Sequence, residues 1–358
     1  MNNNFVLTGS CRLTIALHFL THAQGRPVWG MVNTVVFLFL FQSSHRLKGL
    51  TMNSIQRRAA IFLAAALAAG SVLAQTAAPV RVGSKIDTEG KLLGNMIVLV
   101  LEANGIKTEN KASLGTTKVV RGAITAGEID IYPEYTGNGS FMFSEESSPV
   151  WKNAKAGYER VKTLDYEKNK IVWLEPAPAN NTWAIAVRKD VATANKLKTL
   201  DDMGKWISGG GQFKLAASAE FAERSDALPA FQKAYGFTLK PEQILTLAGG
   251  DTATTIRAAA EKTSGVNAAM AYGTDGPLAA LGLVIMEDTK AVQAIFAPAP
   301  IIREDALKKN PKIKDVLAPV FKTLDGPTLQ SLNAKIQLEG QDAKKVAGDF
   351  LKSRGLLK

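Results

Sequence analysis

Two reactive side chains are scarce in this 358-residue sequence, and both are confined to its first segment. The single cysteine is Cys11, and the three histidines are His18, His22 and His45. The rest of the chain therefore offers neither a thiol nor an imidazole. This excludes Cys or His nucleophiles, Ser-His-Asp triads and the usual zinc sites from that part. No other residues are spaced as a catalytic constellation, so we expect no enzyme activity, no metal site and no cofactor.

The segment from Met52 has the layout of a secretory signal peptide. Basic Arg57 and Arg58 precede a fifteen-residue, largely apolar run, and small residues lead up to Ala74. The run falls short of the roughly 20 residues that a transmembrane helix needs. We expect residues 52–74 to be removed and the mature chain to be periplasmic. No cysteine follows Ala74, so a lipid anchor is not expected. Residues 1–51 precede this complete signal sequence, and we interpret them as an extension from a start codon assigned too early.

Excess charge of one sign is also small once the signal peptide is removed. Six of the 43 Lys and Arg residues and none of the 32 Asp and Glu residues precede Gln75, which leaves a net charge of +5. Clusters such as Lys308-Lys309 and Lys344-Lys345 fit solvated helix faces better than a nucleic-acid-binding stripe. We therefore expect no nucleic-acid partner.

Short apolar runs alternate with helical patterns from Val80 onwards, which predicts an α/β fold. Proline-rich breaks at residues 175–181 and 296–300 interrupt this alternation and predict two crossings between domains. The expected boundaries are 79–180 plus 297–358 for lobe 1 and 181–296 for lobe 2. Each lobe should hold a mixed sheet flanked by helices. Two lobes joined by two crossings describe a hinged binding protein with its site in the cleft.

The stretch Gly127–Gly139 combines a strand pattern with a glycine-rich turn. Ile129 and Ile131 alternate with polar residues, and we expect Pro133 to end the strand because it lacks an N–H. Gly137 and Gly139 would permit positive φ angles and a close approach of backbone to a neighbour. The segment by itself is more typical of an ordinary turn with polar residues than of a binding site, but as a site it would direct Tyr135 and its neighbours into a cleft at the carboxyl end of the strand.

Four aromatic residues lie within two positions of Pro, Gly or Asn instead of within apolar stripes: Tyr135, Trp183, Tyr272 and Phe296. Core packing would explain each of them singly. Their positions at a strand end, at each crossing and in the turn after residue 271 favour a common location in the cleft.

Several motifs resemble the substrate-binding proteins of ABC importers for glycine betaine, choline and related osmoprotectants, and most closely the YehZ (OsmF) branch. They are Gly-Ser-Lys-Ile-Asp-Thr-Glu-Gly at 83–90, Leu-Gly-Thr-Thr at 114–117, Gly-Glu-Ile-Asp-Ile-Tyr-Pro-Glu-Tyr-Thr-Gly at 127–137, Glu-Phe-Ala-Glu-Arg at 220–224 and Tyr-Gly-Thr-Asp-Gly at 272–276. The resemblance extends over residues 79–358 and implies the two-lobed type II periplasmic binding protein fold.

The resemblance also implies roles for individual residues. The aromatic cage for a quaternary ammonium group would be Tyr135, Trp183, Tyr272 and Phe296. The ligand carboxylate would face Arg224, Lys85 and Asn138. This sequence departs from the family at Phe296, where Tyr is usual, and at Asn138, where a second Thr is common. Aromatic faces suit a trimethylammonium group because it carries charge but no N–H.

The resemblance therefore predicts a substrate-binding subunit that captures a quaternary amine such as glycine betaine and delivers it to an inner-membrane ABC permease. We expect it to act as a monomer. A ligand sensor without a transporter and, less favoured, an enzyme on the same scaffold are the alternatives.

Overall fold

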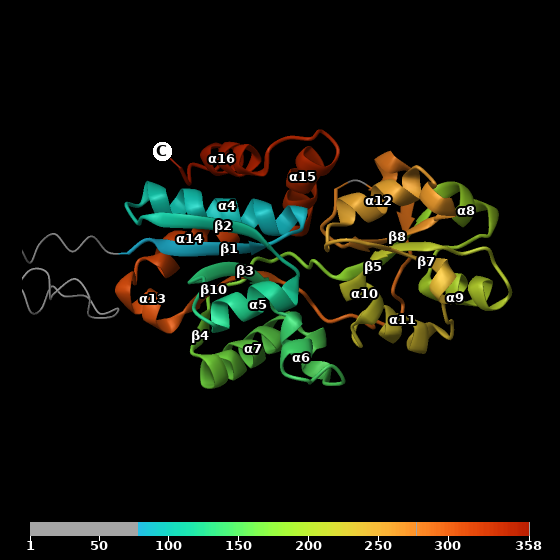
Figure 1. The fold of residues 1–358 in the computed structure, drawn as a ribbon, viewed down its shortest axis with the longest axis horizontal. Helices are drawn as coiled ribbons and strands as arrows, with labels where there is room; N and C mark the ends of the chain where they lie inside the picture. Colours follow the sequence, from blue (N-terminus) through green and yellow to red (C-terminus); the bar gives the residue numbers. More distant parts are fainter. Residues whose placement is uncertain (1–77, 277, 358) are drawn as a thin grey trace, which may run out of the picture. The chain divides into compact units, whose positions relative to one another are not determined.

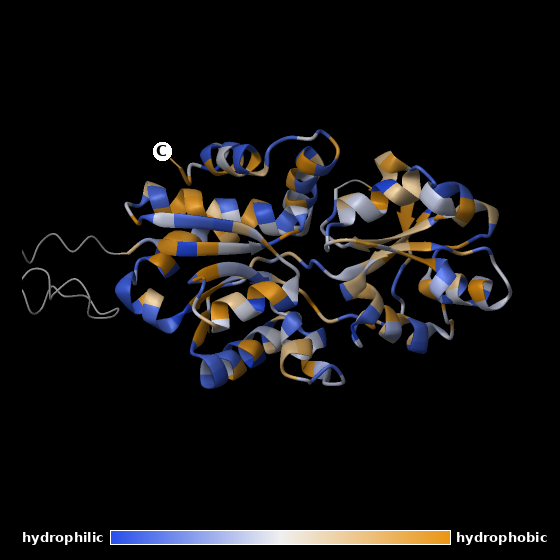
Figure 2. Cartoon of the chain, viewed as in Figure 1, coloured by the Kyte–Doolittle hydropathy of each residue, from blue (hydrophilic) through white to orange (hydrophobic). Residues whose placement is uncertain are grey.

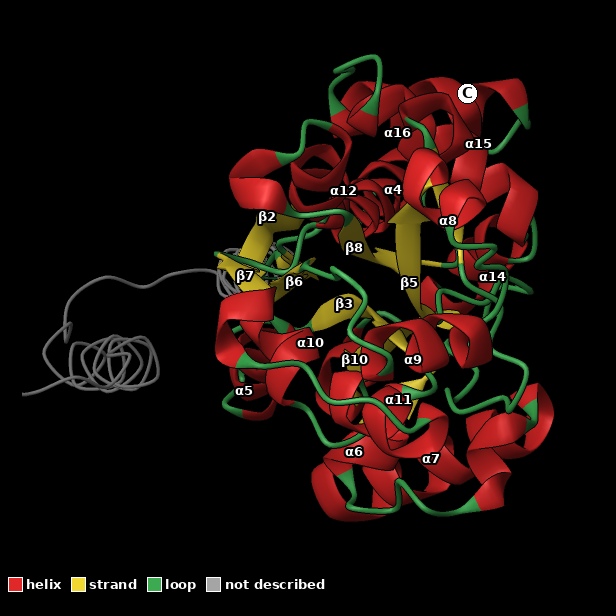
Figure 3. Cartoon of the chain, turned by 90° about the vertical axis from the view of Figure 1, so that its right-hand side faces the viewer, coloured by secondary structure: helices red, strands yellow, loops and turns green. Residues whose placement is uncertain are grey.

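The structure is a computed structural model that describes residues 78–276 and 278–357, and its element labels follow Figure 1. The signal peptide and the extension expected within residues 1–74 lie outside the described residues. Two five-stranded sheets organise the chain, and each is flanked by helices, as Figure 3 shows for the central band of strands. We name the two sheets with their helices lobe 1 and lobe 2.

The sheet of lobe 1 has the strand order β2-β1-β3-β10-β4. Strand β1 pairs in parallel with β2 and β3, whereas β10 runs antiparallel to β3 and β4, so the sheet is mixed as expected. The strands are β1 (Val80–Lys85), β2 (Thr108–Gly115), β3 (Ile131–Tyr135), β4 (Ile171–Trp173) and β10 (Pro298–Arg303).

The sheet of lobe 2 has the strand order β7-β6-β8-β5-β9. Strand β6 is parallel to β7 and β8, and β5 is antiparallel to β8 and β9. The strands are β5 (Trp183–Arg188), β6 (Leu215–Ser218), β7 (Ile244–Leu247), β8 (Ala268–Tyr272) and β9 (Leu283–Ile285).

Helices connect most of these strands and close the chain. Those of residues 88–169 are α4 (Thr88–Ala103), α5 (Thr117–Thr125), α6 (Asn138–Met142) and α7 (Ala154–Asn169). Those of residues 189–260 are α8 (Lys189–Ala194), α9 (Leu200–Ser208), α10 (Ala219–Glu223), α11 (Leu228–Tyr235) and α12 (Thr252–Ala260). The last are α13 (Glu304–Lys309), α14 (Ile313–Phe321), α15 (Gly326–Gln337) and α16 (Ala343–Ser353).

Helix α4 is the centre of the lobe 1 core. Asp87 caps it by accepting a hydrogen bond of 2.8 Å from the Gly90 N–H. Its apolar residues Leu92, Met96 and Ile97 are fully buried and belong to one cluster with residues of α14, α15 and α16. In lobe 2 the hydrophobic residues are concentrated in the sheet, and Figure 2 shows them along the central strands β5 and β8. The C-terminal helices thus pack on lobe 1, and residues 77–358 form one compact unit.

The strand β10 was not expected, because prolines at 298 and 300 suggested an irregular crossing. In the structure, Pro300 lies opposite Pro133 in the antiparallel pair of β10 with β3. The Thr136 N–H donates to the Ala297 carbonyl, so Thr136 and Ala297 are a hydrogen-bonded pair. Such pairs alternate with non-hydrogen-bonded pairs along two antiparallel strands. Pro133 and Pro300, three positions further on, form a non-hydrogen-bonded pair, in which neither nitrogen points at the other strand. Pro133 therefore lies within β3, and the prediction that it ends the strand is wrong.

The two glycines after β3 serve close packing and not unusual backbone angles. Gly137 has a φ of −63° and Gly139 is helical, so the expected positive φ is absent at both. A Cβ atom on Gly137 would lie 2.8 Å from the Phe296 ring, and one on Gly139 would lie 2.7 Å from Trp151. The expected close approach is present, and it is what these positions require.

The chain passes between the two sheets at residues 174–182 and again at residues 286–297. These segments overlap the proline-rich breaks that predicted the crossings. The lobe boundaries at 180/181 and 296/297 stay a prediction.

Candidate functional site

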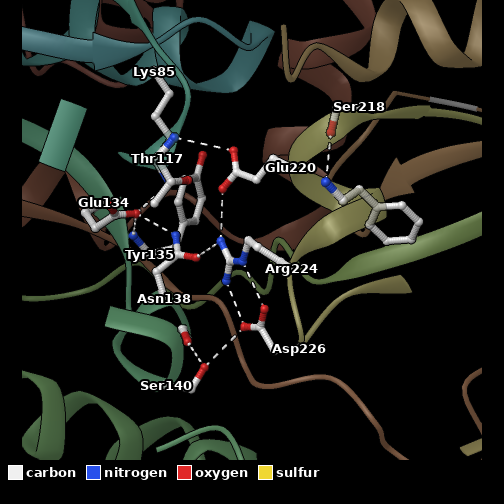
Figure 4. Close-up of polar contacts among 12 residues, drawn as sticks. Lys85, Thr117, Glu134, Tyr135, Asn138, Ser140, Ser218, Glu220, Arg224 and Asp226 are labelled. Atoms are coloured by element: carbon white, nitrogen blue, oxygen red, sulfur yellow. Dashed lines mark hydrogen bonds and ion pairs between the residues drawn. The ribbon is translucent and has the colours of Figure 1, made fainter. Parts of the chain in front are cut away.

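A small cavity lies where strands β1, β3, β5 and β8 approach one another at the junction of the two lobes. Its volume is about 30 Å³. The residues that line it include six of the seven predicted site residues: Lys85, Tyr135, Asn138, Trp183, Tyr272 and Phe296. The seventh, Arg224, is not a lining residue but donates hydrogen bonds to two of them, Asn138 and Glu220 (Figure 4).

The four aromatic side chains reach the cavity from different elements. Tyr135 is the last residue of β3, Trp183 the first of β5, and Tyr272 the last of β8. Trp183 and Tyr272 are partners in the strand register, and their ring centroids are 4.8 Å apart with a tilt of 39°. Phe296 precedes β10 and packs on Gly137. Paired antiparallel strands and a strand end thus gather the aromatic rings around one space.

A lysine ammonium covers the ring of Tyr135. The Lys85 Nζ atom lies 4.7 Å from the ring centroid, in the geometry of a cation–π contact. The same ammonium donates a hydrogen bond of 2.6 Å to Glu134. Lys85 is only 6% exposed, so its charge is neutralised within the protein.

Glu134 is a fully buried carboxylate that organises the cavity wall. One oxygen accepts from the Lys85 ammonium, the Tyr135 N–H and the Asn138 amide, at 2.6, 2.7 and 2.8 Å. The other accepts from the Tyr132 hydroxyl at 2.8 Å. Burial by itself raises the pKa of Glu134, but the Lys85 charge and these hydrogen bonds outweigh burial and lower it. No partner for Glu134 is evident in the sequence, because Lys85 is 49 residues away.

Arg224 is also engaged by the protein itself. Its Nε and Nη2 atoms donate to Asp226 at 2.9 and 2.8 Å, and its Nη1 atom donates to Glu220 at 3.0 Å and to Asn138 at 2.9 Å (Figure 4). The guanidinium carbon lies 4.3 Å from the centroid of the Phe141 ring. Burial by itself lowers the pKa of Arg224, but the hydrogen bonds and charges of Asp226 and Glu220 together outweigh burial and raise it. The arginine therefore stays charged, with most of its donors in use.

Glu220 lines the cavity and joins the two lobes. One carboxylate oxygen accepts from Arg224, and the other lies 3.4 Å from the Thr117 N–H in the first turn of α5. A negative charge is favourable at a helix N-terminus, where backbone N–H groups lack partners. In the sequence, Glu220 is visible only as the first residue of the motif at 220–224, and that motif by itself predicts no role for it.

Glu89 was a second residue without an expected role, since a Glu in the first turn of a helix is a common start signal. One carboxylate oxygen accepts from the Tyr135 hydroxyl at 3.0 Å and from Asn181 at 2.8 Å, and the other accepts from Asn333 at 2.8 Å. Burial raises the pKa of Glu89 to about 7, against the opposing hydrogen bonds. Asn181 and Asn333 also donate to Thr274 of lobe 2, so Glu89 belongs to an interlobe network.

No group of three or more His, Cys, Asp or Glu residues within residues 78–276 and 278–357 is arranged to hold a metal ion. None of the helices in these ranges is long and apolar enough to cross a bilayer.

Two mixed sheets, joined by two crossings and enclosing an aromatic-lined cavity, define a two-lobed α/β ligand-binding protein of the type II periplasmic binding class. Residues 78–353 match the model of the family described as the substrate-binding domain of the ABC-type glycine betaine transport system, and the chain belongs to this family.

Several known proteins are similar to the chain. The glycine betaine-binding protein YehZ of Escherichia coli (strain K12) is 64% identical over 292 residues, which cover 82% of this chain and 96% of the relative. The glycine-betaine-binding protein of Pseudomonas aeruginosa is 30% identical over 312 residues, or 86% of this chain and 96% of the relative. Among solved structures, apo YehZ is 65% identical with a TM-score of 0.58, over 78% of this chain and 100% of that chain.

Proposed function

We propose that this protein captures a quaternary-ammonium osmoprotectant, such as glycine betaine, between its two lobes and delivers it to an inner-membrane ABC permease. The observation that carries the proposal is the convergence of Tyr135, Trp183, Tyr272 and Phe296 on one cavity. The family and the ligand printed in the names of the two relatives support the same class of substrate.

In this proposal the four aromatic rings surround the methylated cation. A trimethylammonium group cannot donate a hydrogen bond, and each desolvated aromatic face contributes about 0.5 to 2 kcal/mol to its binding. Lys85, Asn138 and Arg224 form the polar side toward the ligand carboxylate. A charge-assisted hydrogen bond there contributes about 1.5 to 3 kcal/mol. Association itself costs at least about 4 kcal/mol, so micromolar or weaker binding is the expected outcome.

The location follows from the family and from the sequence. We propose that residues 52–74 direct export and that the chain works as a periplasmic monomer. Relatives of this class are substrate-binding parts of transporters, which supports a role in binding and not in turnover.

The test is calorimetric titration of the exported chain with glycine betaine, choline, carnitine and proline betaine, with tryptophan fluorescence recorded alongside. Saturable heat with at least one ligand at millimolar concentration or below is expected. A matched titration with glycine, which lacks the three methyl groups, should give no heat. Silence from all four quaternary amines would remove the proposed function.

A further inference from the structure

The cavity is too small for the ligand that the proposed function assigns to it. A volume of about 30 Å³ accommodates roughly two water molecules. A betaine has several times as many non-hydrogen atoms. The lobes must therefore open or the side chains that now fill the site must move when a ligand enters, and the identity of those side chains indicates what the ligand replaces.

The first such group is a positive charge at an aromatic face. The Lys85 ammonium lies 4.7 Å from the Tyr135 ring centroid, which is the position that a quaternary ammonium takes on an aromatic ring. A ligand cation that uses this face of Tyr135 must displace the lysine.

The second group is a negative charge at the polar side. Glu220 holds Arg224 at 3.0 Å and approaches the first turn of α5 at the Thr117 N–H. A ligand carboxylate would need these same donors, since carboxylates bind best to guanidinium groups and free backbone N–H groups. Figure 4 shows the contacts of Glu220 with Arg224 and with Thr117.

A single amide connects the two groups. Asn138 donates to Glu134, which also holds the Lys85 ammonium, and accepts from the Arg224 Nη1 atom that also holds Glu220. The positive and negative side chains are therefore the ends of one continuous hydrogen-bonded chain across the site.

Resting on the proposed function, we infer that Lys85 and Glu220 act as an internal substitute for the ligand. The ammonium of Lys85 occupies the place of the ligand cation on Tyr135, and the carboxylate of Glu220 occupies the place of the ligand carboxylate on Arg224. A zwitterionic betaine displaces both, and the released Lys85 ammonium then faces its carboxylate. Both residues thereby limit affinity and set which class of amine binds.

The anionic half is tested with Glu220→Gln and two probes, glycine betaine and tetramethylammonium, which lacks a carboxylate. Glutamine keeps the size of the side chain but no longer competes as an anion. We expect the dissociation constant for glycine betaine to fall about fivefold or more, because charge-assisted hydrogen bonds become available to the ligand. Tetramethylammonium binding should stay within about twofold of wild type, since this probe has no group for Arg224.

The cationic half is tested with the paired substitution Lys85→Met and Glu134→Gln, which removes both charges and leaves no unpaired buried carboxylate. Freeing the face of Tyr135 should tighten tetramethylammonium binding about fivefold or more. Glycine betaine should gain less, because Lys85 can no longer meet its carboxylate. Lys85→Arg keeps the charge and should give no gain with tetramethylammonium.

A matched control separates competition from lobe closure. Glu146 accepts a hydrogen bond of 3.1 Å from Ser225 across the lobes but does not line this cavity, so Glu146→Gln should leave both affinities unchanged. If wild type binds glycine betaine and neither variant binds its probe more tightly, this inference is wrong and the proposed function stands. If none of the proteins binds a quaternary amine, both fail.

Discussion

At the scale of single residues, the site depends on aromatic faces held at the ends of strands. Trp183 is 6% exposed and Tyr135 is 5% exposed, so each ring is fixed by its surroundings and turned to the cavity by its strand. The Trp183 ring also packs on Phe221, with the two ring centroids 5.1 Å apart. Rings fixed in this way lose little side-chain entropy when a ligand arrives.

Removing either ring should therefore weaken binding by a measurable factor. We expect Trp183→Ala and Tyr135→Ala each to raise the dissociation constant for glycine betaine about tenfold or more, which corresponds to about 1.4 kcal/mol. Calorimetry on the two variants measures this effect. Trp206→Ala is the control, because Trp206 packs on Phe213 at 6.2 Å in lobe 2 and lies outside the cavity lining. Unchanged affinity in both cage variants would contradict the aromatic cage.

The sequence predicted a common location for these aromatic residues because they fall at a strand end, at the two crossings and in a turn, and the family resemblance implied their role. It could not predict the charges around them. Lys85 pairs with Glu134 only because β1 and β3 lie side by side in the sheet. Arg224 reaches Asn138 across 86 positions of the chain. Pairings of this kind depend on the tertiary fold, and no local pattern reports them.

At the scale of elements, the short helix α10 positions the anionic side of the cavity. Strand β6 ends at Ser218, whose side chain accepts a hydrogen bond of 3.1 Å from the Phe221 N–H and so caps α10 (Figure 4). The helix carries Glu220 and ends before Arg224. The cap therefore fixes the start of the element that presents both charged groups.

Loss of this cap should have a defined cost. Ser218→Ala should lower the free energy of unfolding by about 1 kcal/mol and change glycine betaine affinity, because Glu220 and Arg224 lose a fixed frame. Urea unfolding gives the first quantity and calorimetry the second. Ser208→Ala, at an exposed helix end, should stay within about 0.5 kcal/mol of wild type. Equal stability of Ser218→Ala and wild type would show that the cap does not hold α10.

The elements themselves were largely predictable, with one instructive exception. The alternation of apolar runs and helical patterns from Val80 onwards predicted the α/β fold with a mixed sheet in each lobe, and both sheets are mixed. Strand β10 was not predicted from the sequence, because prolines are rare in central strands. Its two prolines are tolerated at positions where the β3 partner needs no donor from them.

At the scale of the whole molecule, the Glu89 network ties both lobes and the C-terminal helices together. The carboxylate lies in the first turn of α4 and receives hydrogen bonds from Tyr135, Asn181 and Asn333 of α15. The last two residues also bind Thr274 after β8. The two-lobed architecture followed from the order of elements and the proline-rich crossings. This junction did not, since it joins residues up to 244 positions apart.

Because this carboxylate is buried, the stability of the protein should depend on pH through Glu89. Its pKa is about 7 in the folded state against an ordinary value of 4.5, mainly because of burial and with a further upward contribution from the nearby Asp87 charge. Below pH 4.5 both states hold the proton. Between about pH 4.5 and 7 the folded state keeps it while the unfolded state releases it, so stability falls as pH rises through this window.

The substitution Glu89→Gln isolates this contribution from those of other groups. The unfolding free energy of wild type minus that of Glu89→Gln should fall by roughly 1 to 3 kcal/mol from pH 4.5 to pH 7.5. Wild type is thus the relatively less stable protein at the higher pH. Urea unfolding at a series of pH values measures it. The exposed Glu128 provides the matched control, and Glu128→Gln should track wild type at every pH. A difference between wild type and Glu89→Gln that is constant across the window, or that grows with pH, would mean that Glu89 keeps its charge in the folded protein.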